Sequence, residues 1–413
     1  MKRRGVLACL VVLGVGLALA GPCAAAERGP VRIGLLVPLT GAAAQIGTDM
    51  RNGFMMGVED AGAQAAGRKI EVVVEDDEAN PATTLTKTRK LVENDRVHVV
   101  AGGLLASSCY AVAPYVTTKK IPYFALCAAD DLTQRKPVEY LVRTSLSSSQ
   151  DLHPFGEYVA KVLGYKRVVT VGADYAFGWE AIGGFQRTFE ENGGQVVQKL
   201  WAPLNAQDFA PYLSQIKRDV DAVFMLFFGA QALRVTKQYQ DYGLKGSLPL
   251  LAAGQMTDES VLPSMGDEAL GIITPLHYSA ALDTPTNKRF QRIYRQRYGK
   301  VASYYSANLY VIAQAIVETI KAVAGDVENT PRFLAAGKRV KLPDTPRGPI
   351  EMDETGNVIH NTYIRKVERA GGELQNTVIY TYPRVSQFWK YRKEDYLKQP
   401  VYDRNNPPCR FCQ

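Results

Sequence analysis

The chain has 413 residues and a formal net charge of +8 at pH 7, and 46% of its residues are hydrophobic. Without residues 1–26 it keeps 387 residues and a charge of +5, a length too great for one compact core and suited to two lobes of ordinary domain size. After the N-terminus no stretch approaches the ~20 consecutive apolar residues of a membrane span, which excludes membrane insertion of the mature chain. A nucleic-acid partner would need a basic stripe on a folded face, so we interpret the basic excess as solvated surface.

The first predicted element is an export signal at residues 1–26. A basic start is followed by an uncharged apolar run and by small residues suited to cleavage, a pattern typical of a secretory signal peptide. A lipid anchor on Cys23 is the alternative, but Pro22 directly before it fits lipid modification poorly. The three parts of the signal are Met1-Lys2-Arg3-Arg4, Gly5 to Ala20 and Ala24-Ala25-Ala26.

From Val31 to about Tyr278 short apolar strands alternate with amphipathic helical patterns. Asn80-Pro81 predicts a helix start, with Asn as the N-cap and Pro at the first helical position. A strand–helix–strand rhythm produces parallel sheets with helices on both faces. The strands are predicted at Arg32–Pro38, Glu71–Glu75, His98–Gly102, Tyr123–Cys127, Val168–Ala173, Val196–Trp201, Ala222–Phe228, Leu248–Ala253 and Ile272–Tyr278.

The alternation ends after Tyr278. Two long helical patterns follow at Thr286–Tyr298 and Ser303–Ala324, and β-type segments follow around Gly348–Glu351, Val358–Val367 and Thr377–Tyr382. The sequence therefore predicts an α/β fold in which the late elements return to complete two units. We assign residues 31–145 with about 279–350 to lobe 1, residues 146–278 with about 351–385 to lobe 2, and no role to the tail 386–413.

Four cysteines remain after the signal, and export makes disulfides plausible. Cys409 and Cys412 have the spacing of a redox or metal motif, but they lie at the very C-terminus without a second ligand pair or room for a following helix. We predict a terminal disulfide between them, with pairing to another cysteine as the alternative. Whether Cys109 and Cys127 are bridged or are buried thiols stays open.

Several short segments occur in a characteristic order between Val31 and Lys366. They are Ile33–Gly41, Pro122–Ala125, Arg143-Thr144-Ser145, Asp174–Gly178, Tyr298–Tyr305, and Gly348–Asp353 with Gly356-Asn357. Together they resemble the type I periplasmic binding proteins, in the leucine/isoleucine/valine-binding-protein-like branch of ABC transporter receptors. The resemblance implies two Rossmann-like lobes joined by a three-segment hinge, which we place near Arg143–Gln150, Pro275–Ala281 and Gly348–His360.

The resemblance also implies a function. A protein of this kind lies in the periplasm, captures a small carboxylate or an amino acid between lobes that close by hinge motion, and presents it to an inner-membrane ABC permease. A periplasmic sensor that reports the ligand to a signalling partner is the alternative on the same fold. A remote alternative is an exported enzyme that acts on a small acid or amide.

Lobe 1 offers two loops for ligand binding, because ligands collect beyond the carboxyl ends of strands in open α/β sheets. The loop with Ala106, Ser107 and Ser108 begins a helix whose free N–H groups suit an anion. The loop with Ala128 and Ala129 follows the next strand. In the receptors that this chain resembles, these loops hold the ligand carboxylate; otherwise the two serines cap a helix.

Lobe 2 offers aromatic side chains at its strand ends, namely Tyr175, Phe177 and Phe228. As pocket walls they favour an apolar or aromatic ligand body; the alternative is that they belong to the core. Gln255 stands where the amino-acid receptors carry an acid for the ligand ammonium, and a buried ammonium without a partner is costly. We therefore expect an amine-free aromatic or aliphatic acid, with a branched-chain or aromatic amino acid as the alternative.

Signatures of enzymes, metals and cofactors are missing from the sequence. Four histidines lie at least 55 residues apart, with no HExxH or other close metal spacing. There is no GxSxG elbow and no phosphate-binding loop. We predict a binding protein that is not an enzyme and needs no metal or cofactor.

Overall fold

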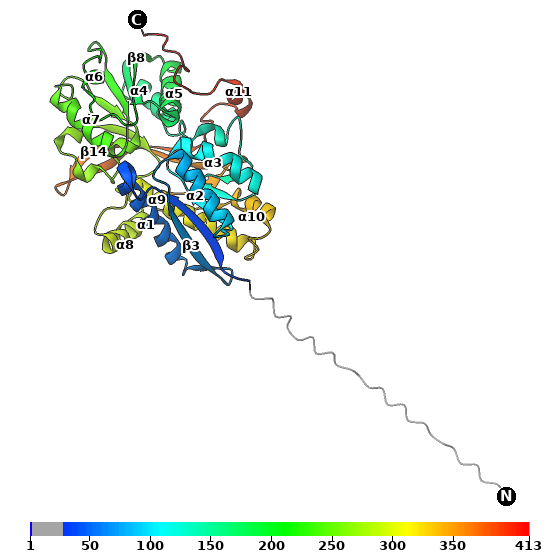
Figure 1. Cartoon of the computed structure of the whole chain (residues 1–413). Helices are drawn as coiled ribbons and strands as arrows, with labels where there is room; N and C mark the ends of the chain where they lie inside the picture. Colours follow the sequence, from blue (N-terminus) through cyan, green and yellow to red (C-terminus); the bar gives the residue numbers. More distant parts are fainter. Residues whose placement is uncertain (2–27, 413) are drawn as a thin grey trace.

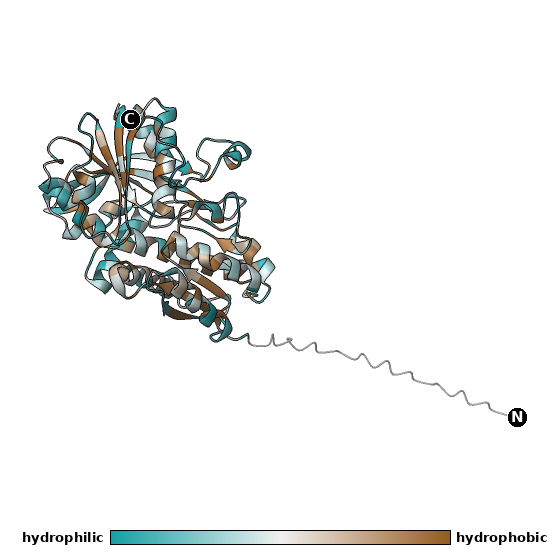
Figure 2. Cartoon of the chain, turned by 45° about the horizontal axis from the view of Figure 1, so that its top comes forward, coloured by the Kyte–Doolittle hydropathy of each residue, from teal (hydrophilic) through white to brown (hydrophobic). Residues whose placement is uncertain are grey.

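The computed structural model describes Met1 and residues 28–412. The predicted export signal therefore lies outside the described residues. Two lobes stack end to end (Figure 1), and hydrophobic residues concentrate in the strands between the helices (Figure 2). The predicted α/β fold with two lobes and a three-segment hinge is confirmed.

The first lobe contains a six-stranded sheet of order β2-β3-β1-β4-β5-β6, parallel except for the short edge strand β2. Its central strand β1 is almost fully buried because helices cover both faces of a parallel sheet. The strands are β1 Val31–Val37, β2 Gln64–Ala65, β3 Arg68–Asp76, β4 Val99–Gly102, β5 Tyr123–Ala125 and β6 Leu141–Val142. The helices are η1 Gly41–Ala43, α1 Ala44–Asp60, α2 Pro81–Glu93, α3 Ala106–Lys119, η2 Asp130–Leu132, α8 Pro285–Tyr298, α9 Tyr304–Ala322 and α10 Thr330–Gly337.

The second lobe contains a nine-stranded sheet of order β12-β13-β14-β11-β10-β9-β7-β8, with β15 paired to β14. Strands β7 to β11 are parallel, and β14 runs antiparallel to β11. The strands are β7 Arg167–Ala173, β8 Gln195–Ala202, β9 Ala222–Leu226, β10 Leu250–Ala252, β11 Ile273–Leu276, β12 Lys341–Leu342, β13 Ile350–Met352, β14 Val358–Ala370 and β15 Glu373–Val385. The helices are α4 Leu152–Lys161, α5 Ala176–Glu191, α6 Ala210–Leu213, α7 Gly229–Asp241, η3 Gly254–Thr257, η4 Leu262–Ser264, η5 Asp267–Ala269 and α11 Lys393–Lys398.

The chain passes between the lobes three times, after β6, after β11 and before β12. Strand β12 pairs with β13 and so belongs to the second sheet, although the sequence analysis placed its residues with lobe 1. Asn80 caps α2 as the sequence indicates, because its Oδ1 accepts hydrogen bonds from the N–H groups of Ala82 and Thr83.

Glycines on α1 set the position of α9. A Cβ atom on Gly53 would lie 2.0 Å from the carbonyl oxygen of Ser306, and one on Gly57 would lie 2.8 Å from the carbonyl oxygen of Tyr310. Only glycine permits this close approach of the two helices. The contact fixes the N-terminal turn of α9 above the interlobe space.

Both cysteine pairs are disulfides in the structure. Cys109 is joined to Cys127, which ties the first turn of α3 to the end of β5. Cys409 is joined to Cys412 in the tail. The four cysteines in the described part of the chain are thus paired.

The tail packs against both lobes. The ring of Tyr396 on α11 is fully buried, between Arg135 of lobe 1 at 5.3 Å and Arg187 of lobe 2 at 5.2 Å. The Arg135 Nε donates to the carbonyl oxygen of Gln399 at 2.8 Å. In Figure 1 the tail, in red, runs from α11 along α5 toward β8.

Truncation after Asn406 removes the terminal disulfide and little else. Lys199 Nζ loses the carbonyl oxygen of Pro407, and Gln186 Nε2 loses that of Pro408, but water can replace both acceptors. We expect the free energy of unfolding to change by no more than about 1 kcal/mol. Urea unfolding of the full chain and of the truncated chain measures the change in the free energy of unfolding. Loss of the folded state would show instead that the terminal disulfide supports the fold.

Candidate functional site

A small, partly open cavity of about 40 Å³ lies between the lobes, at the carboxyl ends of parallel strands from both sheets. This is where ligands bind in open α/β sheets. Lobe 1 supplies the segments after β4 and β5 and the start of α9, and lobe 2 supplies those after β7, β9 and β10. The lining residues are Leu104, Leu105, Ala106, Leu126, Ala128, Tyr175, Phe177, Phe228, Gln255, Tyr304 and Tyr305.

Four helices begin at this cavity. Ala106 starts α3, Tyr175 is the N-cap of α5, Phe228 is the N-cap of α7, and Tyr304 starts α9. The first N–H groups of a helix have no partner within it, and the helix dipole adds partial positive charge there. At α9 the N–H groups of Tyr304 and Ser306 already donate to Asp258 and Ser303. The N-termini of α3, α5 and α7 are therefore the ones that favour an anionic ligand in this cavity.

Aromatic rings form most of the remaining wall. Tyr175 lies between Phe177 and Phe228, with ring centroids 6.2 Å from each, and Tyr304 packs edge-on against Tyr305 at 4.7 Å. Burial raises the pKa of the Tyr304 hydroxyl well above its ordinary value of 10, so it stays protonated and can donate a hydrogen bond. The cavity wall is therefore mostly aromatic with polar groups at its edges. Its space of about 40 Å³ would have to widen to admit an aromatic ring.

None of the cavity-lining residues within the described part of the chain is acidic. The nearby Asp258 is fully buried, and its Oδ2 accepts a hydrogen bond of 2.8 Å from the backbone N–H of Tyr304. Burial and the neighbouring Glu259 raise the pKa of Asp258 to about 7. The Oε1 of Glu259 accepts from Asn376 Nδ2 and from the N–H of Ala280, so both acids hold loops in place.

The structure brings most of the predicted site residues together. Six of them line the cavity: Ala106, Ala128, Tyr175, Phe177, Phe228 and Gln255. Ser107, Ser108 and Ala129 are not among its lining residues. Ser108 is fully buried, and its Oγ accepts a hydrogen bond of 3.0 Å from Thr84 Oγ1. The carbonyl oxygen of Ala129 accepts from Arg143 Nη1. Contact of these residues with ligand stays a prediction.

Five lining residues were not predicted as ligand contacts: Leu104, Leu105, Leu126, Tyr304 and Tyr305. Tyr304 and Tyr305 belong to a segment that carries the family resemblance, and they follow the helix cap Ser303. Aromatic residues directly after an N-cap were therefore the available signal, because a first helical turn faces the cavity in three other helices here.

One group of described residues has a geometry that a metal ion could use: Asp151, His277 and His360. Asp151 follows the crossover after β6, His277 follows β11 and His360 lies near the start of β14, and all three are buried. The Asp151 carboxylate lies 2.8 Å from His277 Nδ1 and 3.0 Å from His360 Nε2, and it also accepts from Thr362 Oγ1. Hydrogen bonds among these groups account for the cluster, so we assign it to the hinge.

Two α/β lobes, a three-segment hinge and an interlobe cavity define a receptor that closes around a small ligand. The family model described as periplasmic binding protein matches residues 30–373. The chain belongs to this family.

Named relatives agree with this assignment. The chain is 32% identical to the Leu/Ile/Val-binding protein homolog 6 of Brucella melitensis over 369 residues, which cover 87% of this chain and 93% of the relative. A solute-binding protein of an ABC transporter from Rhodopseudomonas palustris BisB5, in complex with 3,4-dihydroxybenzoic acid, is 34% identical with a TM-score of 0.83. A second one from R. palustris, in complex with 4-hydroxybenzoate, is 30% identical with a TM-score of 0.82. Each structural match covers 87% of this chain and 98% of the solved one.

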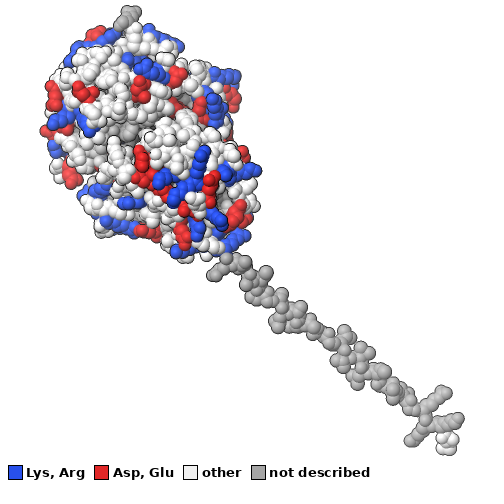
Figure 3. Space-filling model, viewed as in Figure 1, with Lys and Arg blue, Asp and Glu red and all other residues white. Residues whose placement is uncertain are grey.

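The chain is thus a ligand-capturing receptor of the ABC transporter class, a family that works in the periplasm with a membrane permease. Among the described residues, no helix is long and apolar enough to cross a membrane. On the face seen in Figure 3, lysine and arginine are interspersed with aspartate and glutamate.

Proposed function

We propose that this protein delivers an amine-free aromatic carboxylate to an inner-membrane ABC permease, and that it performs no chemistry on the ligand. The observation that carries the proposal is the composition of the cavity wall. The N-termini of α3, α5 and α7 provide donors for a carboxylate, aromatic rings surround the body of the ligand, and no acidic side chain is among the described lining residues to pair with an ammonium. The hydroxybenzoates bound by the two R. palustris proteins support the same class of ligand.

Each wall of the cavity has a distinct part in this proposal. Backbone N–H groups in the first turn of α3 bind the carboxylate, because the Ser108 side chain is fully buried and does not line the cavity. Tyr175, Phe177 and Phe228 pack around the ring. Gln255, which hydrogen-bonds with Tyr304, provides a neutral polar group at the cavity wall. Closure then excludes water and strengthens these contacts.

A thermal-shift screen tests the proposal, since a ligand that binds the native state raises the melting temperature by mass action. The panel contains benzoate, 4-hydroxybenzoate and 3,4-dihydroxybenzoate beside leucine, phenylalanine and tyrosine. We expect a shift equivalent to about 2.7 kcal/mol with an aromatic acid at a concentration 100 times its Kd, and no shift with the amino acids.

The variant Gln255→Glu is the matched control for the amine. A carboxylate at this position would repel an acid ligand and could pair with an ammonium, so the variant should no longer bind aromatic acids. A wild-type shift with leucine or phenylalanine alone would contradict the proposal and identify an amino-acid receptor, as the name of the Brucella relative indicates for that protein.

A further inference from the structure

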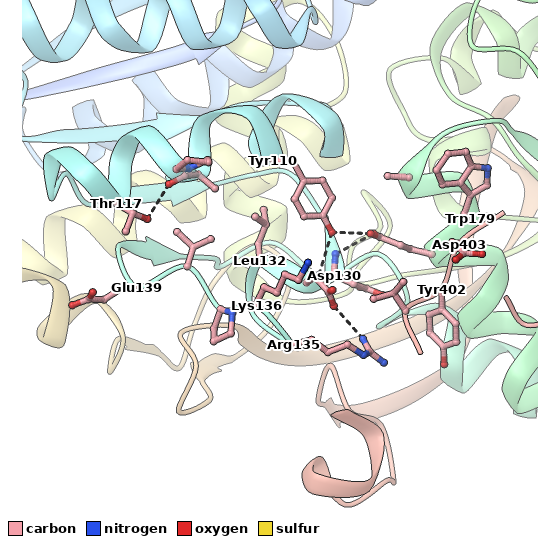
Figure 4. A pocket seen from close by; sticks show the side chains of 18 of the residues that line it. Tyr110, Thr117, Asp130, Leu132, Arg135, Lys136, Glu139, Trp179, Tyr402 and Asp403 are labelled. Carbon is pink, nitrogen blue, oxygen red and sulfur yellow. Dashed lines mark hydrogen bonds and ion pairs between the residues drawn. The ribbon is translucent and has the colours of Figure 1, made fainter. Parts of the chain in front are cut away.

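A second contact between the lobes lies beside the ligand cavity. It borders a groove of about 930 Å³ that is lined by α3, by the segment 130–139, by α5 and by the tail (Figure 4). Tyr110 and Asp130 come from lobe 1, and Glu180 comes from lobe 2. Nothing in the proposed ligand contacts uses these three residues.

Glu180 joins the lobes through both of its carboxylate oxygens. The Tyr110 hydroxyl donates to Oε1 at 3.0 Å, and the backbone N–H of Asp130 donates to Oε2 at 3.0 Å. Glu180 is only 6% exposed, so water does not compete freely for these bonds. Both donors belong to lobe 1, and opening of the lobes would break both bonds at once.

Glu180 does not line the ligand cavity, although Tyr175 and Phe177 on the first turn of the same helix do. Its distance from the ligand space means that any effect on binding must act through closure. A receptor whose closed state is more populated binds its ligand more tightly, because less of the binding free energy is used to close it.

The surroundings of Glu180 oppose its ionisation in the closed form. Burial and the Asp130 carboxylate raise the pKa of Glu180 to about 8, although hydrogen bonds from Asp130 N–H and Tyr110 lower it. Asp130 is itself buried, its Oδ2 has no partner, and its Oδ1 accepts from Ser149 N–H. Other charged or titratable groups near this pair are Arg143, Asp131, Tyr175, Tyr396 and Tyr402.

We propose that Glu180 is a positioning residue. Its two interlobe hydrogen bonds stabilise the closed state and so raise ligand affinity, although Glu180 does not touch the ligand. These hydrogen bonds stabilise the closed state of the ligand-free receptor as well. The inference about affinity rests on the proposed function, whereas the inference about closure needs only the two-lobed fold.

The test measures closure directly. Spin labels on cysteines introduced at the exposed positions Thr86 of lobe 1 and Lys237 of lobe 2 report the interlobe distance, since the four native cysteines among residues 28–412 are paired. In ligand-free protein we expect Glu180→Ala to shift the distance distribution toward open forms. Tyr110→Phe removes one of the two bonds from the opposite lobe, should give a smaller shift, and replaces the alanine variant if that variant fails to fold.

Affinity and its pH dependence provide the second readout, with 4-hydroxybenzoate as the probe. Glu180→Ala should weaken binding roughly 5- to 30-fold at pH 6. The pKa of Glu180 is higher in the closed form than its ordinary value of 4.5, so closure favours the protonated acid and weakens as the pH rises through about 8. Wild-type affinity should therefore fall between pH 6 and 8.5, whereas Glu180→Gln, which stays neutral, should lack this fall.

The outcomes separate this inference from the proposed ligand class. If 4-hydroxybenzoate fails to bind the wild type but Glu180→Ala still opens the ligand-free receptor, the proposed ligand class is wrong, and the inference that Glu180 stabilises the closed state is supported. Identical distance distributions for the wild type, Glu180→Ala and Tyr110→Phe in ligand-free protein would overturn the inference, whatever the ligand does.

Discussion

Replacing Asp151 with alanine should lower the free energy of unfolding by about 3–5 kcal/mol, because each buried donor left without its acceptor costs about 1–3 kcal/mol. Asp151 is 1% exposed and accepts hydrogen bonds from His277, His360 and Thr362. Alanine would leave all three donors buried without their acceptor, and each such group costs free energy. Urea unfolding followed by far-UV circular dichroism measures the loss.

Two variants control this experiment. Asp151→Asn keeps the shape and one acceptor oxygen, so its loss should be smaller than that of alanine. Asp219→Ala removes an exposed acid that pairs with Arg167 and should change stability little, because surface ion pairs contribute little. An unfolding curve for Asp151→Ala that superimposes on the wild-type curve would show that the hinge does not depend on this carboxylate.

The pH dependence of the same interaction has a definite sign. Burial alone would raise the pKa of Asp151, but His360 and His277 outweigh it and hold the pKa well below the ordinary 3.8. A lowered pKa in the folded state stabilises the protein above pH 3.8, and this contribution is lost as the pH falls below that value. The wild type should therefore lose more stability on acidification below pH 4 than Asp151→Ala does.

The cluster also places the hinge in contact with the ligand cavity. The ring of His277 packs edge-on against Tyr304 with centroids 5.3 Å apart, and Tyr304 lines the cavity. Asn308, one turn further along α9, lies 3.2 Å from His277 Nε2 and donates to the carbonyl oxygen of Tyr304. A ligand in contact with Tyr304 would thus be one residue away from His277 in the hinge.

The sheets could be predicted from the sequence because their strands are short apolar runs with regular spacing. Each of the nine strands expected between residues 32 and 278 is present, with ends shifted by a few residues. The strand ends then located Tyr175, Phe177, Phe228 and Gln255, since cavity residues follow strands in this fold. Local patterns were sufficient for this part of the site.

Other parts of the site depend on contacts between distant segments, which no local pattern encodes. Tyr304 reaches the cavity because α9 packs against the glycines of α1, some 250 residues earlier in the chain. The Ser108 hydroxyl is occupied by Thr84 from another helix. Glu180 is indistinguishable in the sequence from a solvated helix residue, and only the closed arrangement of the lobes brings it to Tyr110.

Replacing Phe177 with alanine should weaken binding of an aromatic acid by about 1–3 kcal/mol, a roughly 5- to 150-fold rise in Kd. Phe177 is 8% exposed, lines the cavity and packs against Tyr175 at 6.2 Å. Its ring would bury apolar area against the ligand and hold Tyr175 in place. Isothermal titration with 4-hydroxybenzoate measures the change, and circular dichroism establishes that the fold is kept.

The position of Phe177 on α5 allows its effect to be separated from that of Glu180 on the same helix. Phe177→Ala removes ligand contact and leaves the carboxylate in place, so its affinity should still fall as the pH rises from 6 to 8.5. Phe177→Leu restores part of the apolar surface and should recover part of the affinity, and Tyr242→Ala, at an exposed site, should bind like the wild type. An unchanged Kd for Phe177→Ala would remove this ring from the site and move the aromatic contact to Phe228, Tyr304 or Tyr305.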